Sequence, residues 1–513
     1  MRAPIWVAES RRAPRLRGNV RADVCVVGAG IAGLATAWRL ATAGRSVVVL
    51  DGREPGTGET SRTTAHLVTA LDRGWNALAS IHGESLAQLA ADSHRAAIDA
   101  IETACRDEQV DCHFARVDGF LFAAPGTAHG ILEAELDAAR RVGIDGVEMV
   151  PRAPLRGYDT GPCVRFPRQA VCHPLRLLAA LRNGISRCSG RVFGHTRVES
   201  IEPGRPARVQ ATSGATVTAD AVVVATNPPI AGMPALHAKQ APYRTYAIGA
   251  PVPRGSVADA LYWDTEEPFH YVRIERSSED RDVLIVGGED HRTGQGGGTA
   301  NERYRRLIRW ARVRFPTMGS VAFHWSGQVM ESADGLAFIG RAQSDADLFV
   351  VTGDSGNGMT HGMVAALLLG DLIAGRQNPW QAVYDPHRVR MGSVGRLVRE
   401  NLNVASQLAD WVRPGDVGDA AAIAPGSGAV LRRGLRRVAV YRRPSGELRE
   451  LSATCPHLGC IVRWNAAERT WDCPCHGSRF HPEGNVLSGP TTRGLAPLDV
   501  ETEAVPERHR ERR

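Results

Sequence analysis

A glycine-rich turn near the start of the chain places the strongest limit on the fold. A β-rich apolar run at residues 22–27 leads directly into Gly28-Ala29-Gly30-Ile31-Ala32-Gly33, and a helix-forming stretch follows at 34–43. A second apolar run at 46–50 ends in Asp51. This strand–turn–helix–strand order is typical of units that bind a dinucleotide. The sequence therefore predicts a parallel α/β unit with a dinucleotide site.

The residues of this unit have separate physical roles. Gly28 makes the tight turn, Gly30 lets the backbone approach a pyrophosphate, and Gly33 lets the helix pack closely on the strand. The helix N-terminus presents free N–H groups and the positive end of its dipole to the phosphates. Asp51 ends the second strand, where its carboxylate can accept hydrogen bonds from ribose hydroxyls.

Further segments resemble the D-amino-acid-oxidase-like flavoproteins. Residues 54–65 are rich in glycine and hydroxyl side chains and resemble the loop that wraps FAD in that family. Residues 334–340 (DGLAFIG) look like its DGLPxIG segment, and the glycine-rich turn at 353–360 is followed by an expected helix at 361–374. Residues 221–227 are similar to its strand and ATG element, with Asn227 in place of the usual glycine. The resemblance covers about residues 20–390.

The resemblance implies FAD as cofactor and a set of contact residues from these motifs. They are Gly28, Gly30, Gly33, Asp51, Ser61, Arg62, Thr63, Thr64, His66, Gly353, Asp354, Gly358, Met359 and Thr360. His66 follows a Thr-Thr-Ala run and has two interpretations. It lines the FAD site, or it is bonded covalently to the flavin, as in dimethylglycine and sarcosine dehydrogenase relatives.

The same resemblance divides the first part of the chain. FAD-binding parts are expected at about 20–100, 150–235 and 325–390, with an interleaved α+β substrate domain at about 100–150 and 235–325. Gln328 lies in the segment where amino-acid oxidases of the family place an arginine that clamps a substrate carboxylate. An amide cannot form that forked ion pair, which argues against an amino-acid substrate. The sequence identifies no catalytic residue.

A second pattern lies near the other end of the chain, in two short loops. They read Cys-Pro-His-Leu-Gly-Cys at 455–460 and Cys-Pro-Cys-His-Gly-Ser at 473–478. Two thiolates and two neutral imidazoles suit a [2Fe–2S] cluster in which each iron takes one pair. Structural zinc uses the same donors, but C-x-H is short for a zinc half-site. The expected metal ligands are Cys455, His457, Cys473 and His476.

These loops resemble Rieske proteins specifically, over about residues 416–505, after a connector at 391–415. The expected domain is all-β, with short strands at 429–431, 437–441 and 448–452. The resemblance implies a disulfide between Cys460 and Cys475, and it implies that the Ser478 hydroxyl bonds a bridging sulfide. Gly489-Pro490 resembles the proline loop that covers the cluster, and Phe480 stands where respiratory Rieske proteins have a tyrosine.

Composition excludes several classes of protein. The chain has 513 residues and a net charge of +7, but much of the excess arginine lies near its ends, so no nucleic-acid partner is expected. No apolar run approaches the roughly 20 residues that span a bilayer. The basic N-terminal segment has no apolar stretch typical of an export signal, so we expect a cytoplasmic protein without a membrane span.

Together, the patterns predict an α/β Rossmann-like FAD-binding domain with an α+β substrate domain and an all-β Rieske domain. A flavin accepts two electrons and can release them singly, whereas the cluster carries one. The expected function is a dehydrogenase-type FAD-dependent oxidoreductase acting on a small organic substrate, an amine-like compound being one candidate. Its other partner is an unidentified electron acceptor or donor. The alternative is a non-catalytic electron-transfer or redox-sensing protein.

Overall fold

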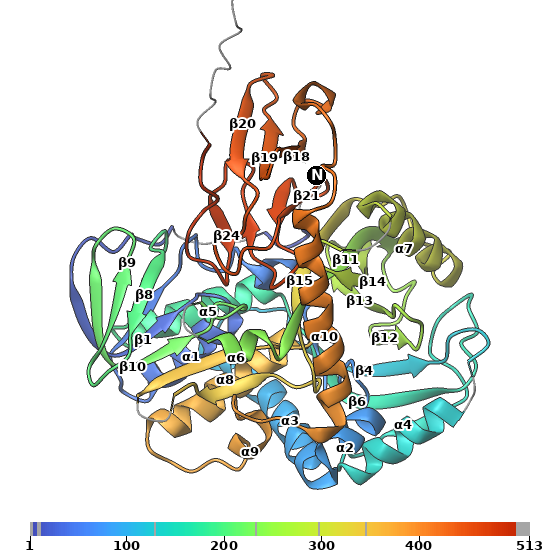
Figure 1. Ribbon diagram of the computed structural model, residues 1–513. Helices are drawn as coiled ribbons and strands as arrows, with labels where there is room; N and C mark the ends of the chain where they lie inside the picture. The colour runs from blue at the N-terminus through green and yellow to red at the C-terminus, as the bar shows by residue number, and fades with distance from the viewer. Residues whose placement is uncertain are drawn as a thin grey trace, which may run out of the picture.

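Two large sheets and a small β-domain organise the computed structural model (Figure 1). The structure describes residues 4–7, 12–127, 130–230, 233–295, 298–343 and 346–498. The small domain lies on top of the body formed by the two sheets, and helix α10 runs along the outside from the body to this domain (Figure 1). None of the helices among the described residues is both long and apolar enough to cross a membrane.

The first sheet has a parallel centre in the order β17-β10-β1-β2-β7, with β16 antiparallel at one edge and the β8–β9 hairpin extending β10. Its strands are β1 Val20–Val27, β2 Val47–Leu50, β7 Arg191–Phe193, β8 Val198–Glu202, β9 Ala207–Ala211, β10 Thr216–Val224, β16 Phe338–Arg341 and β17 Leu348–Thr352. All of β2 and β17 is buried, because one face of the sheet packs against helices and the other face packs against the β8–β9 hairpin.

Helices α1 Ile31–Thr42, α5 Pro174–Arg187, α8 Gly358–Ile373 and α3 Glu84–Asp107 pack together beside this sheet. The expected elements at 22–27, 34–43 and 46–50 are confirmed as β1, α1 and β2. The helix expected at 361–374 begins three residues earlier, at Gly358, because the glycine-rich turn is shorter than its sequence indicates.

The second sheet has nine strands and is mostly antiparallel, in the order β15-β11-β14-β13-β12-β4-β6-β3 with β5 on β6. Its strands are β3 His66–Leu67, β4 Ala115–Phe122, β5 Glu148–Val150, β6 Cys163–Val171, β11 Gln240–Pro253, β12 Leu261–Asp264, β13 His270–Arg276, β14 Arg281–Arg292 and β15 Phe323–Ser332. Helix α7, Ala300–Arg314, packs on β11 and β14. Strands β3, β6 and β15 come from segments assigned above to the FAD-binding part.

The small domain contains a three-stranded and a four-stranded antiparallel sheet. The strands are β18 Gly428–Arg433, β19 Arg436–Arg442, β20 Leu448–Ser452, β21 Arg463–Asn465, β22 Thr470–Asp472, β23 Arg479–Phe480 and β24 Val486–Ser488. The three expected strands are confirmed as parts of β18, β19 and β20. Residues 499–505 of the expected domain lie outside the described residues.

Shorter or peripheral helices complete the fold. They are α2 Trp75–His82, α4 Gly130–Arg141, α6 Pro234–His237, α9 Gln381–Tyr384 and α10 Val394–Ser406, with 3-10 helices η1 Glu59–Arg62, η2 Met391–Ser393, η3 Gln407–Trp411 and η4 Ala420–Ala422. The connector expected at 391–415 is therefore largely helical.

Candidate functional site

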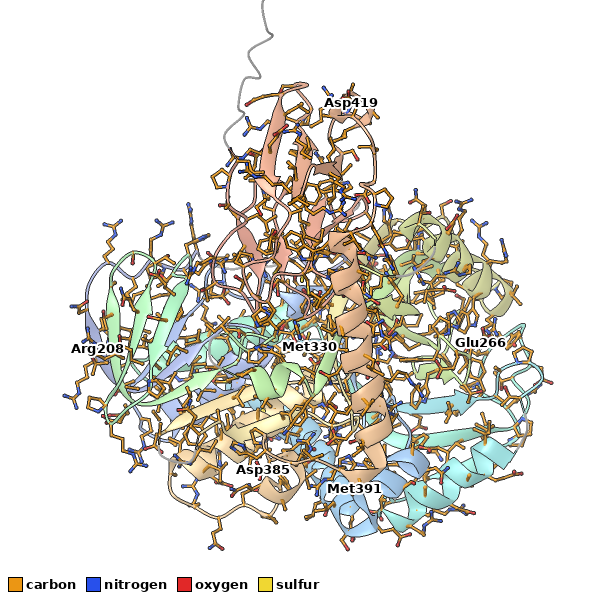
Figure 2. The ribbon with its side chains drawn as sticks, viewed as in Figure 1. Arg208, Glu266, Met330, Asp385, Met391 and Asp419 are labelled. Carbon is orange, nitrogen blue, oxygen red and sulfur yellow. A yellow bond between two sulfur atoms is a disulfide. The ribbon has the colours of Figure 1, made fainter. Side chains whose placement is uncertain are left out.

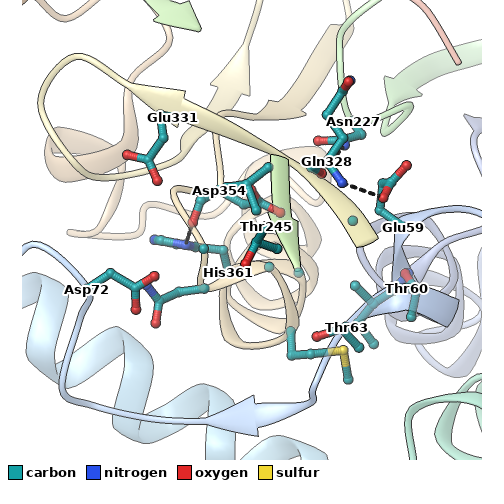
Figure 3. A pocket seen from close by; sticks show the side chains of 18 of the residues that line it. Glu59, Thr60, Thr63, Asp72, Asn227, Thr245, Gln328, Glu331, Asp354 and His361 are labelled. Atoms are coloured by element: carbon teal, nitrogen blue, oxygen red, sulfur yellow. Dashed lines mark hydrogen bonds between the residues drawn. The ribbon is translucent and has the colours of Figure 1, made fainter. Parts of the chain in front are cut away.

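A cavity of about 700 Å³ lies between the two large sheets. Its walls extend from the glycine turn after β1 to the acidic side chains shown in Figure 3. The small domain supplies a further part of the wall through Leu487, Ser488, Gly489, Thr491 and Thr492. All three parts of the fold therefore enclose one space.

The glycine turn closes one end of the cavity. Gly28 has a positive φ of 109°, and a Cβ at Gly33 would overlap the Gly28 carbonyl oxygen, so both positions require glycine. The Asp51 carboxylate accepts hydrogen bonds from the backbone N–H groups of Ala29 and Arg53, both at 2.8 Å. Asn227 adopts a φ of 65°, a conformation that asparagine tolerates better than most residues, which explains why it can replace glycine here.

Ten of the fourteen expected FAD-contact residues line the cavity: Gly28, Gly30, Asp51, Arg62, Thr63, Thr64, His66, Asp354, Gly358 and Met359. The other four lie behind the wall. Gly33 packs α1 on β1, the Ser61 hydroxyl donates to the Gly58 carbonyl at 2.8 Å, Gly353 forms a turn with φ 71°, and the Thr360 hydroxyl donates to the Asn357 carbonyl at 3.1 Å.

His66 has hydrogen-bond partners at both ring nitrogens. Its Nδ1 lies 3.0 Å from the Thr64 hydroxyl, and its Nε2 lies 3.2 Å from the Val272 carbonyl oxygen. Burial, with the nearby Arg273, lowers the pKa of His66 to about 3, so the ring is neutral. These contacts suit a residue that lines the cavity.

Four carboxyl groups line the other end of the cavity: Asp290 and the three labelled in Figure 3, Asp72, Glu331 and Asp354. Only Asp354 belongs to a motif recognised in the sequence. Burial and neighbouring carboxylates raise the pKa of Asp72 to about 7 and that of Glu331 to about 8. Burial also raises the pKa of Asp290 and that of Asp354 to about 7. Such groups can hold or accept a proton near neutral pH.

The two Cys/His loops bring the four expected metal ligands together. Cys455 and Cys473 are buried, neither is in a disulfide, and their thiols are hydrogen-bonded to each other. The rings of His457 and His476 lie 5.0 Å apart. The buried Nδ1 of His476 has no hydrogen-bond partner among the described residues. Two thiols that contact each other and two neighbouring imidazoles, carried by the same two loops, fit the donor set of a Rieske [2Fe–2S] cluster.

The Rieske resemblance also gives roles to residues around these ligands. A disulfide joins Cys460 to Cys475 and so ties the two loops together. The Ser478 hydroxyl lies beside the Cys455 thiol and accepts a hydrogen bond from the Thr491 N–H at 3.4 Å. Phe480 is fully buried in the core of the small domain.

A third imidazole, which no sequence pattern indicates, contacts the two histidine ligands. His237 ends α6 in the body, and its ring lies 4.8 Å from that of His457 and 5.8 Å from that of His476. It is buried, and its Nδ1 has no hydrogen-bond partner among the described residues. The histidine edge of the ligand site therefore faces the body of the protein.

Gln328 connects the cavity wall to the ligand loops. Its side-chain Nε2 donates to the carbonyl oxygen of Gly477, the residue after His476, at 3.0 Å. Its backbone N–H donates to the Glu59 carboxylate at 2.7 Å (Figure 3). A Cβ at Gly477 would lie 2.7 Å from this Nε2, so the close approach requires glycine. Gln328, which replaces the carboxylate-binding arginine of the amino-acid oxidases, thus contacts the small domain.

Six charged side chains form a network between the body and the small domain. Arg62 pairs with Glu468 at 2.8 Å, Arg479 with Asp472 at 3.2 Å, and Arg244 with Asp472 at 3.6 Å, while Glu59 lies 3.6 Å from Arg479. Burial opposes ionisation, but the nearby guanidinium groups hold the pKa of Asp472 below its usual value. Removing one member would leave a buried charge unpaired.

Comparison with protein families agrees with this geometry. The family model described as FAD dependent oxidoreductase matches residues 23–372, and the Rieske [2Fe-2S] domain model matches residues 413–499. Both resemblances drawn from the motifs are confirmed, together with the two cofactors, FAD and a [2Fe–2S] cluster, that these families bind.

Individual relatives cover most of the chain. YhfW of Bacillus subtilis (strain 168), named as a Rieske 2Fe-2S iron-sulfur protein, is 29% identical over 491 residues, 95% of each chain. Gamma-glutamylputrescine oxidoreductase of Escherichia coli (strain K12) is 26% identical over 397 residues, 75% of this chain and 91% of its own. The fold is similar to glycine oxidase from Geobacillus kaustophilus, with a TM-score of 0.61, 20% identity, and coverage of 72% and 100%. The chain belongs to the FAD-dependent oxidoreductase family and carries a Rieske [2Fe–2S] domain.

Proposed function

We propose that the protein oxidises a small cationic amine at the flavin and passes the electrons singly to the Rieske cluster. One observation carries this proposal: the cavity that holds the dinucleotide motif is walled in part by residues 487–492 of the Rieske domain. A domain that forms part of the flavin cavity brings its cluster close to the flavin without a separate docking step.

The charge of the cavity favours an amine. Asp72, Asp290, Glu331 and Asp354 line its far end. Two cations neighbour Glu331: Arg73 lies near it, and Arg396 pairs with it at 3.4 Å. The Gln328 amide points to Gly477 and does not offer a carboxylate clamp. The name of the gamma-glutamylputrescine oxidoreductase relative describes an amine substrate of that protein.

A carboxylate is also required to receive a proton, because an ammonium group must become a neutral amine before its α-carbon can be oxidised. Asp290 is suited to this role. Its Oδ1 has no hydrogen-bond partner among the described residues, and its pKa, raised by burial to about 7, is near that of a general base at neutral pH. FAD, when bound, supplies the two-electron acceptor.

The electron relay rests on the contacts between the two sites. Gln328 lines the cavity and bonds the residue next to His476. His237 of the body packs against both histidine ligands. The cluster ligands therefore lie against the flavin-binding body and not only against solvent.

Anaerobic titration of the holoprotein with amines, amino acids and N-methylated compounds tests both parts. We expect an amine without a carboxylate to bleach the flavin and to produce the EPR signal of a reduced Rieske cluster. Flavin bleaching without that signal would refute the relay. If no compound bleaches the flavin, while a one-electron reductant reduces both centres, the electron-transfer or redox-sensing alternative is favoured.

A further inference from the structure

An exposed surface that is both apolar and basic adjoins the first ligand loop. We call it the exit surface, and it consists of Trp411, Val412, Arg432, Leu435, Arg436 and Leu458. Leu435 is 89% exposed, Val412 72% and Leu458 59%. Large apolar side chains that gather on a surface indicate an interaction site, whereas isolated ones are common.

Hydrogen bonds hold the parts of the exit surface together. The Trp411 indole N–H donates to the Gly459 carbonyl oxygen at 3.0 Å, which fixes the end of η3 against the loop that carries His457. Arg432 donates to the Val412 carbonyl oxygen at 3.2 Å, and Arg437 donates to that of Trp411 at 2.9 Å. The β18–β19 hairpin, the end of η3 and the ligand loop therefore form one continuous surface.

Two arginines of the exit surface have no carboxylate partner among the described residues. The β18–β19 turn contains four arginines in six residues, at 432–437. Arg433 pairs with Glu450 at 2.6 Å, and Arg437 is buried. No carboxylate in the described part of the chain lies within ion-pair distance of Arg432 or Arg436. These two guanidinium groups are therefore available to an external anion.

The exit surface also lies on the open side of the cluster site. The inner side is covered, because His476 is buried, Gly477 bonds Gln328, and His237 packs against both ligand rings. The outer side of the first loop is open, since His457 is partly exposed and the adjacent Leu458 is exposed. An electron that reaches the cluster from the flavin side can therefore leave it through the outer side of the first loop.

We propose that the exit surface binds an acidic protein that carries one electron and that receives this electron from the cluster. The proposal rests on the proposed function, in which the flavin supplies the cluster. Each encounter moves one electron, so the cluster returns to its oxidised state while the carrier is reduced by one electron. Two encounters balance the two electrons of each substrate oxidation. The arginines require an acidic partner, and the exposed apolar side chains require a protein surface.

Cytochrome c tests this surface, because one haem can be presented with opposite charges. The holoprotein is reduced with stoichiometric dithionite and mixed with native cytochrome c, which is basic, or with cytochrome c whose lysines are succinylated, which is acidic. At low ionic strength we expect the acidic form to oxidise the cluster at least about tenfold faster, within the range of electrostatic steering. The difference should shrink as salt is added.

Variants then locate the effect. The Arg432→Glu/Arg436→Glu double variant should lose about tenfold in rate with succinylated cytochrome c and gain with the native form. Leu435→Ser should give a smaller loss with both forms. The control is Arg208→Glu, an exposed residue of β9 far from the Rieske domain (Figure 2), which should change neither rate. An unchanged Rieske EPR spectrum would show that the variants are folded.

Three results would overturn the proposal: faster oxidation by native cytochrome c, no effect of the double variant, or rates that do not depend on salt. A double variant that loses only its binding to phosphatidylglycerol vesicles would assign the surface to a membrane instead. Because dithionite replaces the substrate, these outcomes are separate from a failure to find an amine substrate.

Discussion

The two sides of the Rieske domain differ in the burial and pairing of their charged side chains. On the side that faces the flavin-binding body, Arg479 and Asp472 are buried and paired with each other and with groups of the body. On the outer side, Arg432 and Arg436 are exposed and lack a carboxylate partner among the described residues. Paired and desolvated charges are suited to a permanent interface, whereas exposed unpaired charges are suited to brief encounters. The comparison indicates that the flavin-binding body is a permanent partner of the Rieske domain, whereas the outer side binds a partner transiently.

The largest effect is expected when a ligand of the cluster is replaced, because electron transfer on both sides of the Rieske domain depends on the cluster. Cys455→Ser removes a thiolate ligand, so the Rieske EPR signal and acid-labile sulfide should be lost completely, while FAD remains bound. Cys188→Ser provides the control, because Cys188 lies in the body, outside the ligand loops, and should leave both unchanged. Zinc in place of iron and sulfide in the native protein would contradict the cluster assignment.

Asp290→Asn should affect flavin reduction and leave electron exit unchanged. A general base contributes typically 10²–10⁴-fold, so we expect a loss in that range in the rate of flavin bleaching by substrate. Because the base acts when ionised, the native rate should rise with pH through about 7, the raised pKa of Asp290. A rate that instead falls across this range would exclude Asp290 as the base. Oxidation of the dithionite-reduced cluster should not change.

Asp472→Asn tests how strongly the paired charges stabilise the interface between the Rieske domain and the flavin-binding body. It leaves the buried Arg479 and Arg244 without their shared carboxylate, so the free energy of unfolding should fall by about 3–5 kcal/mol. Denaturant unfolding followed by fluorescence measures this loss. Asp220→Asn is the control, since Asp220 pairs with Arg21 at 3.7 Å on the surface and both side chains are exposed. Equal losses in the two variants would contradict the comparison.

Gln328→Leu should slow electron transfer between the two cofactors without preventing either cofactor from binding. Both should remain, but the Gly477 carbonyl loses its donor, and flavin-to-cluster transfer should slow by about tenfold, equivalent to roughly 1.4 kcal/mol in the barrier. Stopped-flow absorbance after rapid flavin reduction measures this step. An unchanged rate would mean that electrons take another route, such as that through His237.

The smallest effect concerns Phe480. Hydroxyl groups that donate to cluster sulfurs stabilise the extra electron and raise the potential. Phe480→Tyr should therefore raise the midpoint potential by some tens of millivolts, where about 59 mV corresponds to tenfold for one electron. Redox titration by EPR measures it. The absence of a rise would show that this ring does not face a sulfur, and Phe480→Leu serves as the packing control.

Residues whose role depends only on their own short segment of the chain could be recognised from the sequence. Gly28, Asp51 and the two Cys/His loops belong to this class, because backbone geometry and ligand spacing are local properties. No sequence pattern indicates Asp72, Asp290 and Glu331, because the fold brings these carboxyl groups to the cavity from three distant segments. The same holds for His237, which the fold places against ligand loops that are distant in the sequence. Gln328 departs visibly from the family pattern, but its partner Gly477 is 149 residues away in the sequence. The domain boundaries stay predictions.

The shared wall of the flavin cavity has a consequence for the history of the protein. Leu487, Ser488, Gly489, Thr491 and Thr492 belong to the Rieske domain but enclose the space that holds the flavin. A gene fusion that began with two independent modules would stop being reversible once this wall formed, because a shortened chain would open its own active site to water. The iron–sulfur domain is therefore a structural part of the flavin cavity of its neighbour, and not an appendage to it.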